Sequence, residues 1–195
     1  TLNHRLNLFG YLPILDASDE RFRDTGQVGL LDLVAALEWV RAHAGAIGGA
    51  PDNVTIFGHS GGAAKTAALM AMPTAKGLFH KAIVQSTSGG LRLMGRPEAA
   101  RVSEGLAAAL DLPALDPAPL QSLPVERLLA AAGSVGAHLR PLACSPGCPA
   151  DPFDPAPPTM SADVPLMIGT TDTETTWYYP QAPAMFSIDF DDARG

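Results

Sequence analysis

Short apolar runs alternate along the chain with stretches whose apolar residues recur every three or four positions. The apolar runs predict buried strands at 54–57, 81–85 and 164–170. The three- and four-residue spacing predicts helices at 29–44 and 97–110. An alanine-rich run predicts a helix at 62–72, and a short helix is expected at 124–132. Strands that alternate with helices indicate an α/β fold, with a mostly parallel sheet flanked by helices.

The segments between these elements are predicted as connections. Residues 1–15 are expected to be the end of a strand that enters a loop, and residues 16–27 to be an exposed polar segment. Residues 141–158 are dense in proline and are interpreted as an ordered surface loop rather than a linker between domains. The aromatic cluster at 177–179 suits either a binding pocket or core packing.

One connection carries a chemical motif. Gly58-His59-Ser60-Gly61-Gly62 lies between the strand predicted at 54–57 and the helix predicted at 62–72. Gly-x-Ser-x-Gly between a strand and a helix is typical of a nucleophile elbow, a sharp turn with a serine at its apex. Gly58 and Gly62 are expected to lack side chains so that strand and helix approach closely. The helix N-terminus would direct free N–H groups toward negative charge at the apex.

Polar residues with catalytic chemistry follow all three predicted strands. Ser60 follows the first strand, Ser86 the second and Glu174 the third. In a parallel sheet the carboxyl ends of the strands share one edge, where reactive groups gather. The sequence therefore predicts that Ser60, Ser86 and Glu174 lie at the same edge.

Composition narrows the classes of partner. The 195 residues are 47% hydrophobic and carry a formal net charge of −7, which suits a packed globular protein and argues against nucleic-acid or anionic-membrane partners. No apolar run is long enough for a membrane span. Cys144 and Cys148 could form a local disulfide or remain two thiols; without nearby histidines they are weak as a metal site. The compartment stays open.

Several ordered stretches resemble one family, the type-B carboxylesterases (the carboxylesterase/cholinesterase group of the α/β-hydrolases). In chain order the matching stretches are Asn3-His4-Arg5-Leu6, Phe9-Gly10-Tyr11-Leu12, Gly29-Leu30-Leu31-Asp32, Ala36-Leu37-Glu38-Trp39-Val40, Ile47-Gly48-Gly49, 51–58, 77–86 and 162–170 leading to Glu174. The resemblance covers most of the chain and implies an α/β-hydrolase fold with carboxylic-ester hydrolysis.

The resemblance also implies roles for individual residues. Ser60 matches the family's nucleophile, and Glu174 matches the acid of its catalytic triad. Gly61 occupies the position whose backbone N–H helps to form the oxyanion hole, and Ser86 matches a serine that hydrogen-bonds near the acid. An ordinary solvated carboxylate is the alternative for Glu174, and a strand cap is the alternative for Ser86. No cofactor or metal is implied.

The chain departs from the family pattern at four positions. His59 and Gly61 replace the usual Glu and Ala of the elbow, Ala50 replaces an Asp, and Thr175 replaces a Gly. His59 is interpreted as structural, because the residue before an elbow serine normally points away from the reaction centre.

Two catalytic parts of the family are missing from these residues. The His-Gly-Gly-Gly oxyanion loop would precede Thr1, and the catalytic histidine would follow Glu174, whereas the last histidine is His138. Residues 1–195 are therefore expected to be the central segment of a single α/β-hydrolase domain. The remainder of its own polypeptide, or a complementary chain, would complete the enzyme.

The expected function is that of a serine carboxylesterase acting on a small-molecule ester through an acyl-enzyme on Ser60. One alternative is a catalytically inert fragment or a non-enzymatic, cholinesterase-like binding module. A second alternative is a lipase or acyltransferase, which only the Gly-His-Ser spelling at 58–60 favours.

Overall fold

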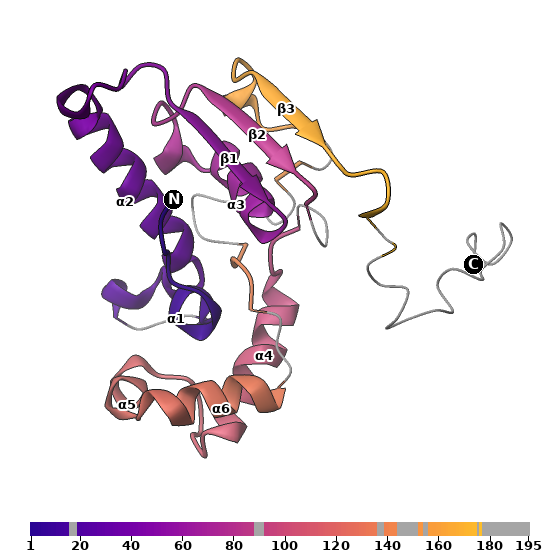
Figure 1. The fold of residues 1–195 in the computed structure, drawn as a ribbon. Helices are drawn as coiled ribbons and strands as arrows, with labels where there is room; N and C mark the ends of the chain where they lie inside the picture. Colours follow the sequence, from indigo (N-terminus) through magenta and orange to yellow (C-terminus); the bar gives the residue numbers. More distant parts are fainter. Residues whose placement is uncertain are drawn as a thin grey trace, which may run out of the picture.

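A computed structural model describes residues 1–15, 19–87, 92–135, 139–143, 152–153, 156–174 and 176. It contains a three-stranded parallel sheet in the order β1-β2-β3, with helices packed beside and beneath it (Figure 1). The strands are β1 (Thr55–His59), β2 (Lys81–Gln85) and β3 (Leu166–Gly169). The predicted α/β fold with a parallel sheet is confirmed.

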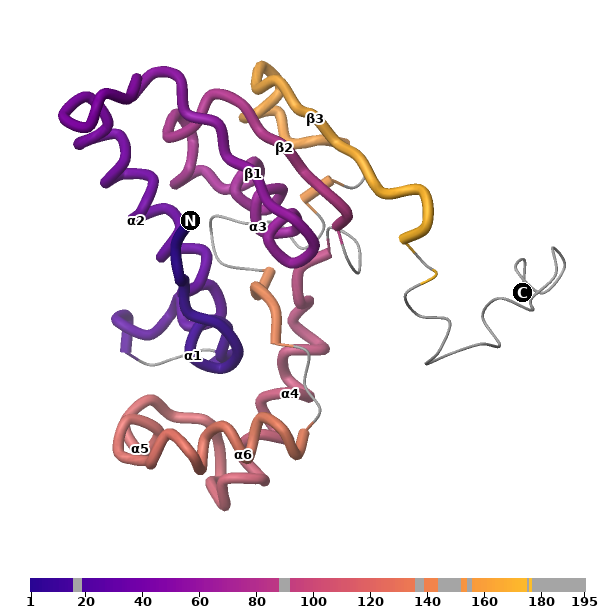
Figure 2. The backbone as a smooth tube through the Cα atoms, viewed as in Figure 1, coloured from indigo at the N-terminus to yellow at the C-terminus, as the bar shows by residue number. Residues whose placement is uncertain are grey.

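The described helices differ in length and in type. The longer α-helices are α2 (Val28–His43), α3 (Gly61–Met70), α4 (Arg96–Ala109) and α6 (Val125–Val135), and each matches a predicted helix. Two shorter α-helices were not predicted: α1 (Asn7–Tyr11) and α5 (Pro117–Ser122). The 3₁₀ turns are η1 (Glu20–Phe22), η2 (Thr25–Gln27), η3 (Ala44–Ile47), η4 (Pro73–Ala75) and η5 (Thr159–Ser161). The backbone trace shows α4, α5 and α6 as a group below the sheet (Figure 2).

The prediction for residues 1–15 is wrong. This segment forms α1 instead of the end of a strand, and Leu8 and Tyr11 on that helix are buried. Its apolar positions made the segment resemble a strand, but they pack against α2 and the helices below the sheet. Contacts distant in sequence, which no local pattern reveals, decide the outcome here.

The prediction that the strands are buried is wrong for β3, whose four residues are all exposed, and for one face of the rest of the sheet. Helix α3 covers the face that carries Ile56 and Ala82, which are 9% and 1% exposed. On the other face Phe57 is 70% exposed and Met167 is 67% exposed, and β-ladder register places them at the same level on either side of Ile83. Parallel sheets normally have both faces covered, so this uncovered face is unusual.

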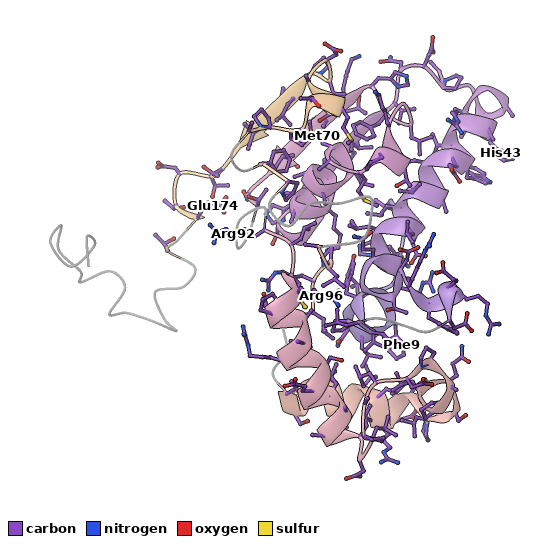
Figure 3. The ribbon with its side chains drawn as sticks, turned by 180° about the vertical axis from the view of Figure 1, so that it is seen from behind. Phe9, His43, Met70, Arg92, Arg96 and Glu174 are labelled. Carbon is purple, nitrogen blue, oxygen red and sulfur yellow. The ribbon has the colours of Figure 1, made fainter. Side chains whose placement is uncertain are left out.

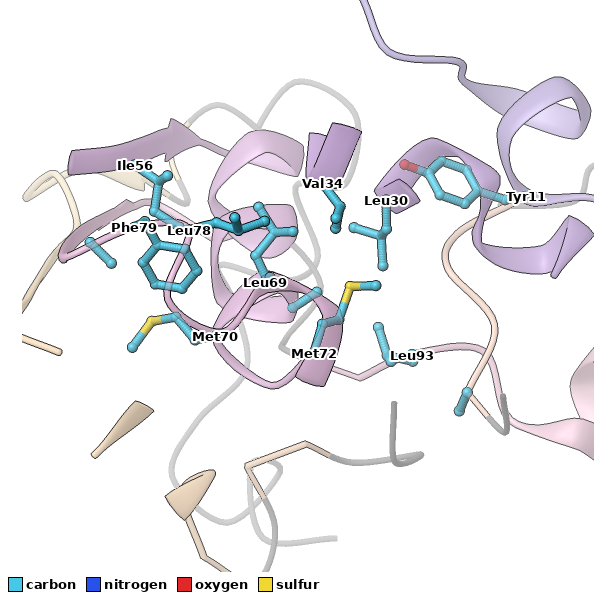
Figure 4. Packing of buried hydrophobic residues seen from close by; sticks show 14 residues of the cluster. Tyr11, Leu30, Val34, Ile56, Leu69, Met70, Met72, Leu78, Phe79 and Leu93 are labelled. Atoms are coloured by element: carbon cyan, nitrogen blue, oxygen red, sulfur yellow. The ribbon is translucent and has the colours of Figure 1, made fainter. Parts of the chain in front are cut away.

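The main hydrophobic core lies between the sheet, α3, α2 and the end of α1 (Figure 4). Ile56 and Phe79 fill the part next to the sheet, while Leu30, Met72 and Tyr11 fill the part next to α2. A second cluster of apolar residues joins α1 to the lower helices through Leu8, Leu106 and Leu128, among others. The main hydrophobic core therefore packs against β1 and α3, the two elements that the elbow joins.

Candidate active site

Ser60 stands at the turn between β1 and α3. Its backbone has φ 55° and ψ −119°, a conformation that non-glycine residues rarely adopt. The turn is held on both sides, since the Ser60 N–H donates to the Gln85 carbonyl oxygen at 2.9 Å and the Ser60 carbonyl oxygen accepts from the Ala64 N–H at 3.1 Å. This strained strand–serine–helix geometry is the one that a nucleophile elbow requires.

The two outer glycines of the motif, Gly58 and Gly62, differ in the space available for a side chain. A Cβ on Gly58 would lie 2.3 Å from the Gly62 carbonyl carbon, so the strand and the helix touch through their backbones at this point. A Cβ on Gly62 would meet nothing within 4 Å. The expected close approach is therefore present, but only Gly58 must lack a side chain.

Gly61 begins helix α3 directly after the serine. Helix N-terminal N–H groups carry partial positive charge and bind anions, which suits the stabilisation of an oxyanion. Lys65, one turn further on, donates from Nζ to the Gly61 carbonyl oxygen at 3.1 Å and lies over the Tyr11 ring at 5.8 Å from its centroid. Burial lowers the pKa of this half-buried lysine.

Lys65 was not predicted from the sequence as a site residue. It adds a cation behind the first turn of α3, where the helix dipole is already positive. A lysine within an otherwise alanine-rich, buried helix was the signal that could have drawn attention to it.

Ser86 and Glu174 meet at the ends of β2 and β3. Ser86 is 7% exposed, has a positive φ of 52°, and donates its hydroxyl to Glu174 Oε1. The same carboxylate oxygen accepts from the Thr171 N–H at 2.8 Å and from Thr171 Oγ1 at 3.1 Å. The predicted neighbourhood of Ser86 and Glu174 is present, and Thr171 is a partner that the sequence did not single out.

These hydrogen bonds favour the ionised form of Glu174. The Ser86 hydroxyl is the largest cause that lowers the pKa of Glu174, and the Thr171 backbone N–H is the next. The charge of His59, at the end of β1, acts in the same direction and is the smallest of these causes. Figure 3 shows Glu174 beyond the end of β3, at the edge of the sheet.

Backbone hydrogen bonds connect the three strand ends. The Ser60 N–H bonds to Gln85, the residue before Ser86, and the Ser86 N–H bonds to Gly169 at the end of β3, at 2.9 Å. Ser60, Ser86 and Glu174 thus sit along one edge of the sheet, as the strand-end rule led us to expect. Their catalytic roles remain predictions.

Of the four histidines in the described part of the chain, three have partners elsewhere. His4 Nδ1 contacts the Arg5 carbonyl oxygen, His43 Nδ1 contacts the Trp39 carbonyl oxygen, and His80 Nδ1 accepts from the Val54 N–H. His59 is exposed at the end of β1. His138 lies outside the described residues, as do Cys144, Cys148, Thr175 and the aromatic cluster at 177–179.

Neither a metal-binding cluster nor a membrane-spanning helix is present among the described residues. Within them, no three His, Cys, Asp or Glu residues are grouped so as to hold a metal ion. Within the same ranges, no helix has both the length and the apolar composition to cross a membrane.

A parallel sheet with helices on its face, and a strained serine between strand β1 and helix α3, define the class of α/β-hydrolases. Comparison with known proteins narrows the class. Residues 1–192 match the carboxylesterase family, and the chain belongs to that family.

Individual relatives agree with this assignment. Over 183 residues, 89% of the chain, it is 39% identical to para-nitrobenzyl esterase of Bacillus subtilis (strain 168), and the match spans 36% of that protein. The crystal structure of the Geobacillus stearothermophilus carboxylesterase EST55 superposes with a TM-score of 0.81 at 34% identity, covering 97% of this chain and 40% of the other. Chicken (Gallus gallus) acetylcholinesterase is 38% identical over 115 residues, or 58% of this chain and 14% of the relative. The chain thus spans well under half the length of each of these proteins.

Proposed function

We propose that these residues form the nucleophile-bearing part of a serine esterase that hydrolyses carboxylic esters. The observation that carries the proposal is the strained backbone of Ser60, held between β1 and α3 beside the N-terminus of a helix. Unfavourable backbone geometry at a serine is retained where the surrounding structure and the function require it. Membership of a family whose named relatives are esterases supports the same reaction class.

In the proposed reaction Ser60 Oγ attacks the ester carbonyl carbon and loses its proton to a histidine base. The carbonyl oxygen becomes an oxyanion, which the Gly61 N–H at the start of α3 would stabilise. Collapse of this intermediate expels the alcohol, which takes the proton from the histidine, and leaves an acyl-enzyme on Ser60. Water then attacks the acyl group with the same proton transfers and releases the acid.

Glu174 would orient the histidine and stabilise its protonated form. This role needs an ionised carboxylate, and the hydrogen bonds from Ser86 and Thr171 favour that form. We assign the histidine to another part of the same polypeptide or to a complementary chain. Within these residues the alternative is His59, which is exposed at the end of β1, directly before Ser60.

The test is replacement of Ser60 by alanine in the complete polypeptide that carries these residues. Hydrolysis of p-nitrophenyl acetate should fall by about 10⁴-fold or more, since no other group replaces a serine nucleophile. Ser122→Ala is the control, because Ser122 is an exposed serine at the end of α5, away from the strand ends. It should retain the burst of p-nitrophenol that marks acyl-enzyme formation.

A fluorophosphonate and mass spectrometry provide a second measurement. The phosphonyl adduct should map to Ser60 and be absent from the Ser60→Ala protein. Unchanged hydrolysis in Ser60→Ala would overturn the proposal. Ester hydrolysis by residues 1–195 alone would show that the base is a histidine of this chain. His59→Gln should then abolish that hydrolysis.

A further inference from the structure

A cavity of about 610 Å³ lies away from the elbow, between α1 and the α5–α6 pair. Its walls also include residues of η1 and η2, and the beginning of α2. Neither Ser60, Gly61, Ser86 nor Glu174 lines it. Figure 3 shows Phe9, one of the lining residues, in the part of α1 next to the lower helices. Cavities of this volume fit drug-sized molecules.

The walls of the cavity are mainly aliphatic. Leu8 and Phe9 come from α1, Leu120 from α5, and Val125 and Leu128 from α6. Phe9 and Val125 remain 38% and 51% exposed, so this apolar surface is only partly covered within the described residues. Exposed apolar surface of this kind, when it is gathered in a concave site, indicates a place where an apolar partner binds.

The charged residues at the cavity are already paired with residues of the protein. Arg5 binds Asp32 at 2.6 Å, Arg21 binds Asp19 at 2.6 Å, and Asp24 lies 3.8 Å from Arg23 Nε. A charged ligand would lose its bound water on entering the cavity, and the charged side chains there are already paired with other residues. Burial of an uncompensated charge is strongly unfavourable, so the cavity selects against ionised ligands.

Two uncharged polar groups remain among the lining residues, Thr25 and Gln121. The Thr25 hydroxyl oxygen is buried and has no hydrogen-bond partner among the residues that the structure describes. A buried hydroxyl without a partner is unfavourable, and a ligand oxygen beside it would supply the missing hydrogen bond.

From these observations we propose that the cavity is a second binding site, separate from the elbow, for a neutral molecule with an alkyl or aryl body and a hydroxyl or ester oxygen. The aliphatic walls bind the body, and Thr25 and Gln121 bind the oxygen. The proposal does not depend on catalysis by Ser60, so the two can fail separately.

The test is a fluorescence titration of the purified Ser60→Ala protein with the neutral dye Nile red, which excludes turnover from the measurement. Decan-1-ol should displace the dye at a concentration at least tenfold lower than decanoate, which has the same chain but carries a charge. Val125→Glu, which places a carboxylate on the cavity wall, should weaken dye binding at least tenfold.

Leu129→Glu is the matched control. Leu129 lies one turn further along the same helix and is 44% exposed, but it does not line the cavity. It should leave dye binding within twofold of the parent, with the circular dichroism of both variants unchanged. Three results would each overturn the proposal. The first is equal weakening of dye binding by the two variants, and the second is displacement of the dye by decanoate as good as by decan-1-ol. The third is loss of dye binding when a phosphonate occupies Ser60 of the parent protein.

Discussion

Gly58 and Gly62 flank Ser60 in one motif, yet only Gly58 lies where a side chain would collide with the backbone. Its Cβ would come within 2.3 Å of two Gly62 atoms, the carbonyl carbon and oxygen, which belong to the main chain and cannot move aside. The elbow is therefore limited by a contact between two backbones. This distinction between the glycines is invisible in the sequence motif.

Gly58→Ala should lower the free energy of unfolding by about 3 kcal/mol or more, because the methyl group forces β1 and α3 apart. Gly62→Ala should instead raise it by up to about 1 kcal/mol, because alanine favours the helix and its methyl group meets nothing within 4 Å. Thermal unfolding of both variants measures the difference. Equal stability of the two would contradict this account of the elbow.

The Ser86 hydroxyl makes the largest contribution to keeping Glu174 ionised. Its removal should therefore change how the stability of the fold depends on pH. The folded-state pKa of Glu174 is lowered, so the stability that its ionisation contributes is present above the unfolded-state pKa. This stability is lost as the pH falls through the lowered pKa. In Ser86→Ala the loss should begin at a higher pH.

Nuclear magnetic resonance of ¹³C-labelled glutamate carboxyls would measure this pKa directly. Thr171→Val serves as a graded control, because the Thr171 hydroxyl lowers the pKa of Glu174 less than the Ser86 hydroxyl does. Its shift should be in the same direction and smaller. A larger shift in Thr171→Val than in Ser86→Ala would reverse the assigned order.

At the scale of elements, one ion pair attaches the N-terminal segment to α2. Arg5 Nε and its second guanidinium nitrogen both donate to Asp32, and the Arg5 backbone N–H donates to the same carboxylate at 2.9 Å. The Arg5 guanidinium and backbone N–H lower the pKa of Asp32. The segment that leads into α1 is thus fixed on α2 by one carboxylate.

Asp32→Asn should lower the free energy of unfolding by about 1 to 2 kcal/mol, because several charge-assisted hydrogen bonds weaken together. The control is Glu20→Gln, which removes the exposed pair between Glu20 and Arg23, and it should cost less than about 0.5 kcal/mol. Urea unfolding followed by circular dichroism measures both. A similar loss in the two variants would show that Asp32 only forms an ordinary surface pair.

The sequence predicted the long elements and missed the short ones, for physical reasons. Strand β2 was predicted at its observed bounds, and α2 within one residue, because each has a sustained apolar pattern. Helix α5 begins with Pro117 behind an Asp116 cap that accepts from the Ala118 N–H, so the sequence does carry a local signal for the start of this short helix. Helix α1 has no side-chain cap and begins at Asn7 with a positive φ of 53°, so its packing determines it.

In the candidate site, too, some features follow from the sequence pattern and others depend on packing in three dimensions. The placement of Ser60, Ser86 and Glu174 at one edge of the sheet follows from parallel strands, whose ends share that edge, and was predictable. The contribution of Lys65 and Thr171 depends on side-chain positions in three dimensions, and the effect of His59 on Glu174 does so too. No spacing in the sequence encodes these contacts.

At the scale of the whole molecule, the uncovered sheet face governs behaviour in solution. Phe57 and Met167 are more than half exposed on this face of the sheet. A large exposed apolar surface favours association. Residues 1–195 by themselves should therefore associate as concentration rises, and Phe57→Thr with Met167→Thr should reduce this.

Sedimentation velocity at increasing concentration measures the association. Ile47→Thr is the control, since Ile47 is 75% exposed but lies in η3, away from the sheet. It should leave association unchanged. An equal reduction by Ile47→Thr would show that association depends on general surface hydrophobicity and not on the sheet face.

The register of the strands also has a consequence for the order of folding. Thr55 of β1 pairs with Lys81 of β2, 26 positions on, whereas Ala82 pairs with Leu166 of β3, 84 positions on. Closing the longer loop costs about 1 kcal/mol more chain entropy, so the β1–α3–β2 unit is expected to form before β3 docks. The turn around Ser60 belongs to the early unit, whereas Glu174 arrives with the last strand. A partly folded chain would therefore present a shaped serine turn well before it positions the carboxylate.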